Sequence, residues 1–167
     1  INLLYNINKL LPVDFSRCFD LMKLNQNDLK YFKFLGWNSK QFEKQFFKDN
    51  FYGLGLFFDN KLKGFVIGDI INIDNIIEYE ILLIYIDNEK RNLGYASKLL
   101  STIYSGLNHR NLKKIYLEVA SNNYKAIKLY TKNGYNKTGT RKKYYNFTNK
   151  KIDALLYEKI INETIKS

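Results

Sequence analysis

The chain has 167 residues, of which 46% are hydrophobic and 26% are charged. These values are typical of a globular domain with one core, and the longest apolar runs are too short to span a membrane. We therefore expect one soluble domain over residues 1–167, with no membrane partner.

The cysteine and histidine content excludes several kinds of site. One cysteine, Cys18, excludes an internal disulfide framework, and the first residues, INLLYNINKLLP, lack the unbroken apolar stretch of a signal peptide. Both features favour a reducing, cytoplasmic location. The single histidine, His109, is expected to be exposed or to cap a helix, so we expect no metal site and no Ser-His-Asp triad.

The formal net charge is +11, from 27 basic and 16 acidic residues. Clustered cations attract phosphate, and the run NGYNKTGTRKKYY at 133–145 interleaves cations with aromatic residues. However, most of the basic residues are Lys, and the abundance of Lys, Asn, Ile, Tyr and Phe is typical of AT-rich codons. A basic module that binds RNA or protein therefore stays an alternative, and no specific nucleic-acid partner is expected.

Two helices are predicted after an extended segment near residues 3–7. The first follows Asp14, the expected N-cap, and its apolar side consists of Val13, Cys18, Leu21 and Met22. The second begins near Asn38 or Ser39, and its apolar side consists of Phe42, Phe46 and Phe47.

Strands and helices then alternate. Two strands joined at Asp59–Asn60 occupy 52–70, and a long third strand follows Asp74–Asn75. A helix is predicted over 93–108, a strand over 113–120, a helix over 123–133 that Gly134 ends, and two strands near 135–144 and 153–161. This order predicts an α/β or α+β domain with a central mixed sheet.

The segment RNLGYASKLL at 91–100 begins a helix directly after a long strand. The first N–H groups of a helix carry partial positive charge and lack partners within the helix, so they can bind phosphate oxygens. Gly94 and Ala96 leave room for a diphosphate, and Arg91 adds a full charge. A glycine in the first turn of a helix more often accommodates packing, so these residues alone favour a packing role over a phosphate site.

Several blocks together resemble the GNAT superfamily of acyl-CoA N-acyltransferases. Its pyrophosphate motif, Gln/Arg-x-x-Gly-x-Gly/Ala, matches residues 91–96. The blocks that resemble its RimI-type members, the ribosomal-protein-alanine N-acetyltransferases, are GWNSKQF at 36–42, LEVASNNYKAIKLYTKNGY at 117–135 and RKKYYNFTNKKIDALL at 141–156. The resemblance implies the GNAT fold: a mixed, mostly antiparallel sheet of six to seven strands flanked by about four helices.

The resemblance also implies roles for individual residues. Glu118 corresponds to the general base, with Glu80 as a competing candidate, and Tyr130 corresponds to the general acid. Residues that would hold acetyl-CoA are Ile84, Tyr85 and Ile86 along the pantetheine arm, Arg91, Asn92, Leu93, Gly94, Tyr95, Ala96 and Ser97 around the pyrophosphate, and Asn123. Tyr144 and Tyr145, together with Glu80, would border the acceptor groove.

Each of these residues also has a structural reading. Glu118 alternates with apolar neighbours and could face solvent, Tyr130 lies on the apolar side of its helix, and Asn123 suits an N-cap. The chemistry nevertheless fits the implied roles, because an α-amine with a pKa of about 7.7–8.0 needs only a modest base. It is the combination of residues that favours the enzyme.

We therefore expect a monomeric N-acetyltransferase that uses acetyl-CoA. Its acceptor would be a protein N-terminal α-amine, most simply the alanine of a small-subunit ribosomal protein. Another amine, from a small molecule or a different protein, is the alternative. The chain has Asn146 and the segment 150–152 where relatives carry Pro and Gly-Glu, which puts the ribosomal acceptor in more doubt than the acetyl transfer.

Overall fold

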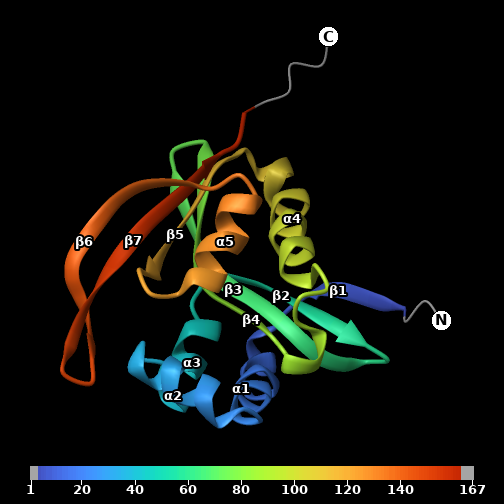
Figure 1. Cartoon of the computed structure of the whole chain (residues 1–167). Helices are drawn as coiled ribbons and strands as arrows, with labels where there is room; N and C mark the ends of the chain where they lie inside the picture. The colour runs from blue at the N-terminus through green and yellow to red at the C-terminus, as the bar shows by residue number, and fades with distance from the viewer. Residues whose placement is uncertain (1–3, 163–167) are drawn as a thin grey trace. The chain divides into compact units, whose positions relative to one another are not determined.

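The computed structural model describes residues 4–162 (Figure 1). The described helices are α1 (Phe15–Lys23), α2 (Gln26–Phe34), α3 (Ser39–Phe46), α4 (Tyr95–Leu107) and α5 (Tyr124–Lys132). The described strands are β1 (Tyr5–Lys9), β2 (Phe51–Phe58), β3 (Lys61–Ile73), β4 (Ile76–Ile86), β5 (Leu112–Ala120), β6 (Asn136–Phe147) and β7 (Lys150–Ile160). Residue 3, where an extended segment was predicted to begin, lies outside the described part.

The seven strands form one sheet in the order β1-β2-β3-β4-β5-β7-β6. The pair β4 and β5 is parallel, and the pairs β1–β2, β2–β3, β5–β7 and β6–β7 are antiparallel. The parallel pair needs a crossover connection, and α4 supplies it. The predicted mixed, mostly antiparallel sheet with flanking helices is therefore confirmed.

The chain divides into two compact units, and the division runs through β3, β4 and α4. The first unit comprises residues up to Asp69 together with Leu82–Ile103, and the second comprises Ile70–Ile81 together with the residues from Tyr104 onward. The two units are described separately below.

Helices α1, α2 and α3 pack beside β2 and β3 to form the core of the first unit (Figure 1). Phe42 lies at its centre and is fully buried. Its ring contacts the rings of Phe19, Trp37, Phe46 and Phe65, with centroid separations of 5.7, 5.7, 5.1 and 5.9 Å. Burial of one Phe side chain contributes about 1.5–3 kcal/mol, so this aromatic cluster fixes α1 and α3 on the sheet.

Two of the predicted apolar faces differ from the structure. Val13 lies in the 3₁₀ turn Pro12–Asp14 ahead of α1 and is 67% exposed, because the helix begins only at Phe15. Phe47 follows the last residue of α3, leaves the helical conformation and is 56% exposed. The remaining predicted core positions in α1 and α3 are buried, Cys18 among them.

Strands β5, β7 and β6 and helix α5 make up most of the second unit. A tight turn at Thr148–Asn149 joins β6 to β7, and both of its residues have positive φ. The register of β6 shifts between Lys137 and Gly139 and again between Arg141 and Tyr145. Each such irregularity bends a strand, and the β6–β7 hairpin is long and curved in Figure 1.

No helix within residues 4–162 is long and apolar enough to cross a membrane.

Candidate functional site

The turn between β4 and α4 presents an open backbone at the start of a helix. Asn92 and Gly94 have φ values of +60° and +84°, so α4 begins at Tyr95 rather than at the predicted Leu93. A Cβ placed on Gly94 would meet no atom within 4 Å. Helix geometry leaves the first N–H groups of α4 without partners within the helix. The turn therefore offers N–H groups and free space to an anion such as a diphosphate.

Side chains of this turn point in different directions. Leu93 is 62% exposed. The ring of Tyr95 packs edge-on against Tyr5 and Phe58, with both centroid separations at 5.2 Å. This packing ties the first residue of α4 to strands β1 and β2, and Ala96 and Ser97 follow it in the first turn.

An ion pair holds the segment that precedes the turn. Asp87, which is 8% exposed, accepts a hydrogen bond from Lys63 Nζ at 2.7 Å, and its backbone N–H donates to the Lys63 carbonyl oxygen at 2.8 Å. The bond to the carboxylate raises the pKa of Lys63 above its ordinary value. Strand β3 therefore fixes the point where the chain leaves β4.

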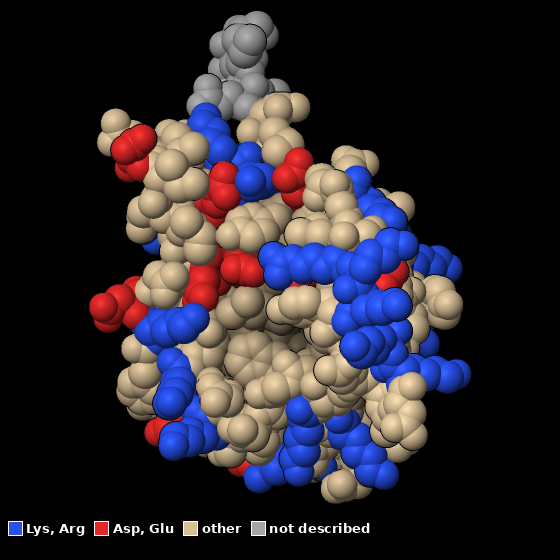
Figure 2. Space-filling model, turned by 90° about the vertical axis from the view of Figure 1, so that its left-hand side faces the viewer, with Lys and Arg blue, Asp and Glu red and all other residues tan. Residues whose placement is uncertain are grey.

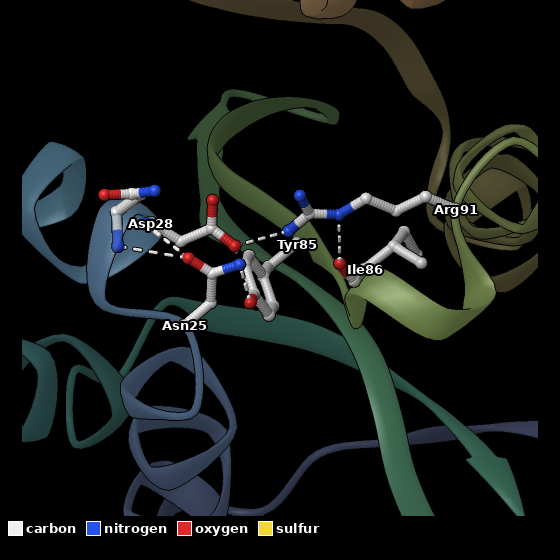
Figure 3. A network of polar contacts seen from close by, with 6 residues as sticks. Asn25, Asp28, Tyr85, Ile86 and Arg91 are labelled. Atoms are coloured by element: carbon white, nitrogen blue, oxygen red, sulfur yellow. Dashed lines mark hydrogen bonds and ion pairs between the residues drawn. The ribbon is translucent and has the colours of Figure 1, made fainter.

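A second polar network lies at the other end of that segment (Figure 3). Arg91 Nη2 donates to Asp28 Oδ2 at 2.6 Å, and Arg91 Nε donates to the Ile86 carbonyl oxygen at 2.8 Å. The hydroxyl of Tyr85 donates to the same Asp28 oxygen at 2.9 Å. Burial and this carboxylate raise the pKa of Tyr85. The predicted coenzyme residues Tyr85, Ile86 and Arg91 are thus brought together with Ile84 adjacent in β4, and Asp28 joins them.

Glu118, the predicted base, lies on β5 in the second unit. Its Oε1 is 3.0 Å from Arg141 Nη2, and its side chain is 21% exposed. The guanidinium of Arg141 also lies over the ring of Tyr144, 5.4 Å from its centroid. Glu118 therefore has a charged partner, Arg141. A carboxylate that only faced solvent would need no such partner.

The alternative base, Glu80, shares a face of the sheet with Glu118. Glu80 is the partner of Tyr116 across the parallel β4–β5 pair, and Tyr116 is two residues before Glu118. Because side chains alternate along a strand, the three residues point to one side. Lys114 on the same side pairs with Glu78 at 3.2 Å.

The predicted acid, Tyr130, is in α5 and is 5% exposed. Its ring meets that of Tyr135 edge-on at 5.7 Å, and its carbonyl oxygen accepts the Tyr135 N–H at 3.1 Å. Asn123 is the N-cap of α5, since its Oδ1 accepts the Ala126 N–H at 3.2 Å. The structural roles expected for Tyr130 and Asn123 are both present, and their roles in catalysis and coenzyme binding stay predictions.

Tyr144 and Tyr145 lie at the second irregularity of β6. Their rings meet edge-on at 5.0 Å. Tyr144 is 51% exposed, and Tyr145 is half-buried. Asp153 on β7 accepts the Lys143 N–H at 2.8 Å and so fixes the backbone directly before these two tyrosines. The role of the pair in acceptor binding stays a prediction.

The β6–β7 hairpin also carries a group of exposed cations: Lys137, Arg141, Lys142, Lys143, Lys150 and Lys151. We call this group the hairpin cations. In the view of Figure 2, Lys and Arg side chains cover a larger area than Asp and Glu side chains.

Sequence reasoning missed two charged residues that contact predicted site residues. Asp28 and Arg141 lie 63 and 23 residues away in the chain from Arg91 and Glu118, respectively. Asn25-x-x-Asp28 does carry a local signal, because Asn25 caps α2 and Asp28 lies in its first turn. No local pattern indicates either long-range ion pair.

Comparisons with known proteins agree with the fold. The model of the acetyltransferase (GNAT) family matches residues 16–135. The crystal structure of the ribosomal-protein-S18-alanine N-acetyltransferase from Escherichia coli superposes with a TM-score of 0.78 and 21% identity, covering 98% of this chain and 100% of that one. Arabidopsis thaliana NAA60 in complex with acetyl-CoA superposes with a TM-score of 0.74 and 17% identity, covering 95% of this chain and 99% of that one.

A curated relative is more similar over a shorter stretch. The [ribosomal protein bS18]-alanine N-acetyltransferase of Haemophilus ducreyi is 42% identical over 52 residues, which are 31% of this chain. The match spans only 36% of the length of that relative. The family model, by contrast, extends from α1 through α5 and includes the β4–α4 turn, Glu118 and Tyr130. The chain therefore belongs to the acetyltransferase (GNAT) family.

Proposed function

We propose that the chain transfers the acetyl group of acetyl-CoA to the N-terminal α-amine of a protein. The first acceptor to test is the N-terminal alanine of a small-subunit ribosomal protein, by analogy with the two relatives named for that activity. A cytoplasmic setting is consistent with such an acceptor.

The open turn at Gly94 is the observation that carries the proposal. Its positive φ and the space where a Cβ would lie suit the close approach of a diphosphate. The N–H groups at the start of α4 would bind the phosphate oxygens. Backbone groups of Ile84–Ile86 would hold the pantetheine arm along β4.

Acetyl-CoA would supply the activated thioester, and the chain would move protons. The amine nitrogen forms a bond with the carbonyl carbon, and the bond from that carbon to sulfur breaks. Glu118 would accept the amine proton, directly or through water, and the Tyr130 hydroxyl would donate to the departing sulfur. A tyrosine has an ordinary pKa of about 10 and a thiol of about 8.5, so Tyr130 would act chiefly as a hydrogen-bond donor.

Thiol release from acetyl-CoA tests the proposal directly. Peptides beginning Ala, Ser, Met-Glu and Met-Leu are compared with spermidine. We expect turnover with at least one peptide and slower turnover with spermidine. Turnover with spermidine alone would make the acceptor a small amine, and binding of RNA without turnover would favour the binding module.

Two matched variants test the base. Glu118→Gln is expected to lower kcat about a hundredfold or more, because general-base catalysis contributes roughly 10²–10⁴-fold. Glu80→Gln removes the neighbouring carboxylate on the same face and is expected to change kcat by less than about tenfold. The reverse order of effects would assign the base to Glu80.

A further inference from the structure

Asp28 is held in place by the start of α2. Asn25 Oδ1 caps the helix by accepting the N–H groups of Asn27 and Asp28 at 3.0 and 3.2 Å. A carboxylate in the first turn is further stabilised by the helix dipole. With 22% of its side chain exposed, Asp28 presents Oδ2 to two donors, the Tyr85 hydroxyl and Arg91 Nη2.

Arg91 is correspondingly held on more than one side. Its Nε donates to the last carbonyl group of β4, at Ile86, while Nη2 donates to Asp28. The guanidinium also lies over the ring of Tyr85, 5.3 Å from its centroid. In Figure 3 the side chain runs from its place at the turn toward Asp28. The planar fork of an arginine is suited to bridging two acceptors in this way.

These contacts distinguish two possible roles of Arg91 in coenzyme binding at the turn that follows it. An arginine that ligated the diphosphate would exchange Asp28, a charged partner at 2.6 Å, for the phosphate oxygens. An arginine that stays on Asp28 and Ile86 instead fixes the backbone from which the turn begins. In the second case the phosphate contacts come from backbone N–H groups alone.

We propose that Asp28 is a positioning residue for the binding of acetyl-CoA. Together with Tyr85, Asp28 fixes the side chain of Arg91, and Arg91 then connects α2, the end of β4 and the 91–96 turn. We call this role of Arg91 the brace. Arg91 then acts on the coenzyme through the position of the turn. The inference rests on the proposed function, since it concerns the same coenzyme.

The two roles of Arg91 predict opposite effects when Asp28 is changed. If Arg91 is a brace, Asp28→Asn loosens the turn and weakens coenzyme binding. If Arg91 is a phosphate ligand that Asp28 restrains, the same substitution frees the guanidinium and leaves binding equal or tighter. Arg91→Lys separates the roles again, because a lysine can bind phosphate as a point charge but cannot bridge Asp28 and Ile86.

The experiment is calorimetric titration of the full chain with CoA. For the brace we expect the Kd to rise about tenfold in Asp28→Asn, Arg91→Ala and Arg91→Lys, the size of effect expected for one charge-assisted contact. The double variant Asp28→Asn/Arg91→Ala should be no more than about twofold weaker than Arg91→Ala alone, because contacting residues are not additive. The Kd of Tyr85→Phe for CoA should lie between that of the wild type and that of Asp28→Asn.

Controls address folding and specificity. Arg17→Ala removes a comparable arginine, which pairs with Asp14 at 3.3 Å and lies over the ring of Phe57, and it should leave the Kd unchanged. Binding of S-acetylpantetheine, which lacks the diphosphate, should not change in any variant. In turnover, the KM for acetyl-CoA should rise in Asp28→Asn while kcat at saturation is retained.

Two results would overturn the brace: unchanged or tighter CoA binding by Asp28→Asn, or near wild-type binding by Arg91→Lys. A loss of S-acetylpantetheine binding equal to the loss of CoA binding would also overturn it, since the effect would then be general. A chain that does not use acetyl-CoA gives a different result, because the wild type itself would then bind no CoA. A different acceptor amine would change the turnover assay and leave these CoA affinities as expected.

Discussion

At the residue scale, neighbours in the chain fix both ends of α5. Asn123 caps α5, and Gly134 adopts φ +85° after it, as local rules require. Glu118 and Arg141 show the limit of such rules. Their ion pair depends on how β5, β7 and β6 align, and strand register is a long-range property that no short pattern specifies.

The buried hydroxyl of Tyr135 predicts an alkaline limit to stability. Burial raises the pKa of Tyr135 above its ordinary value of about 10. Its stabilisation is therefore fully present below about pH 10 and is lost as the pH rises toward the folded-state pKa. Between about pH 10 and 11 we expect the free energy of unfolding to fall more steeply in the wild type than in Tyr135→Phe, by up to about 1.4 kcal/mol per pH unit.

Urea unfolding at several alkaline pH values measures this difference. Tyr124→Phe is the control, because the Tyr124 side chain is 76% exposed and its loss should leave the wild-type slope intact. Parallel curves for the wild type and Tyr135→Phe would contradict the argument.

At the scale of the element, backbone geometry decided where the predicted helices begin. Periodicity placed Leu93 in α4, but the positive φ at Asn92 and Gly94 is incompatible with a helix, so the turn ends only at Tyr95. Helix α2 was not predicted. Its signal was present in the Asn25 cap and in Leu29 and Phe32, three residues apart on its buried side.

The Gly94 turn supports a prediction that separates strain from ligand binding. Gly94→Ala forces an alanine into the left-handed region, which costs about 1–2 kcal/mol of stability. Its Cβ would also occupy the space proposed for the diphosphate. We expect the Kd for CoA to rise at least about tenfold, a change worth about 1.4 kcal/mol.

Gly36→Ala is a closely matched control. Gly36 has φ +93°, and a Cβ there also meets nothing within 4 Å, so the backbone strain is similar. Thermal unfolding should show comparable destabilisation of the two variants, while calorimetry should show weaker CoA binding for Gly94→Ala alone. Equal CoA affinities in the two variants would count against a diphosphate at this turn.

At the scale of the whole molecule, composition and element order indicated the class of fold but not its strand order. Alternating strands and helices predicted a mixed sheet, and the sheet is mixed, because β4 and β5 are parallel whereas β5 and β7 are antiparallel. The element order did not predict that β7 lies between β5 and β6. This position requires β7 to pair with β5, which does not directly precede it in the chain. The family resemblance implied a mostly antiparallel sheet of six to seven strands, but it did not give this order.

The net charge of +11 leads to a prediction about the acceptor. A positive surface raises the local concentration of acidic partners, and salt weakens the effect because the Debye length shortens from about 30 Å at 0.01 M to about 3 Å at 1 M. For two peptides with the same N-terminal residue, we expect a higher kcat/KM when acidic rather than basic residues follow it. The preference should shrink as the NaCl concentration rises from about 0.02 to about 0.5 M.

The hairpin cations include Arg141–Lys143, the longest run of consecutive Lys and Arg residues in the sequence, and are therefore the first place to test this preference. Lys150→Glu/Lys151→Glu changes the net charge by the same amount as Lys30→Glu/Lys33→Glu, and all four lysines are exposed. If the hairpin attracts the acceptor, the first pair should abolish the preference at low salt and the second should retain most of it. Equal effects of the two pairs would mean that overall charge, rather than the hairpin, acts on the peptide. No preference in the wild type at low salt would mean that the charge has no part in choosing the acceptor, as expected if it reflects the Lys-rich composition of the chain.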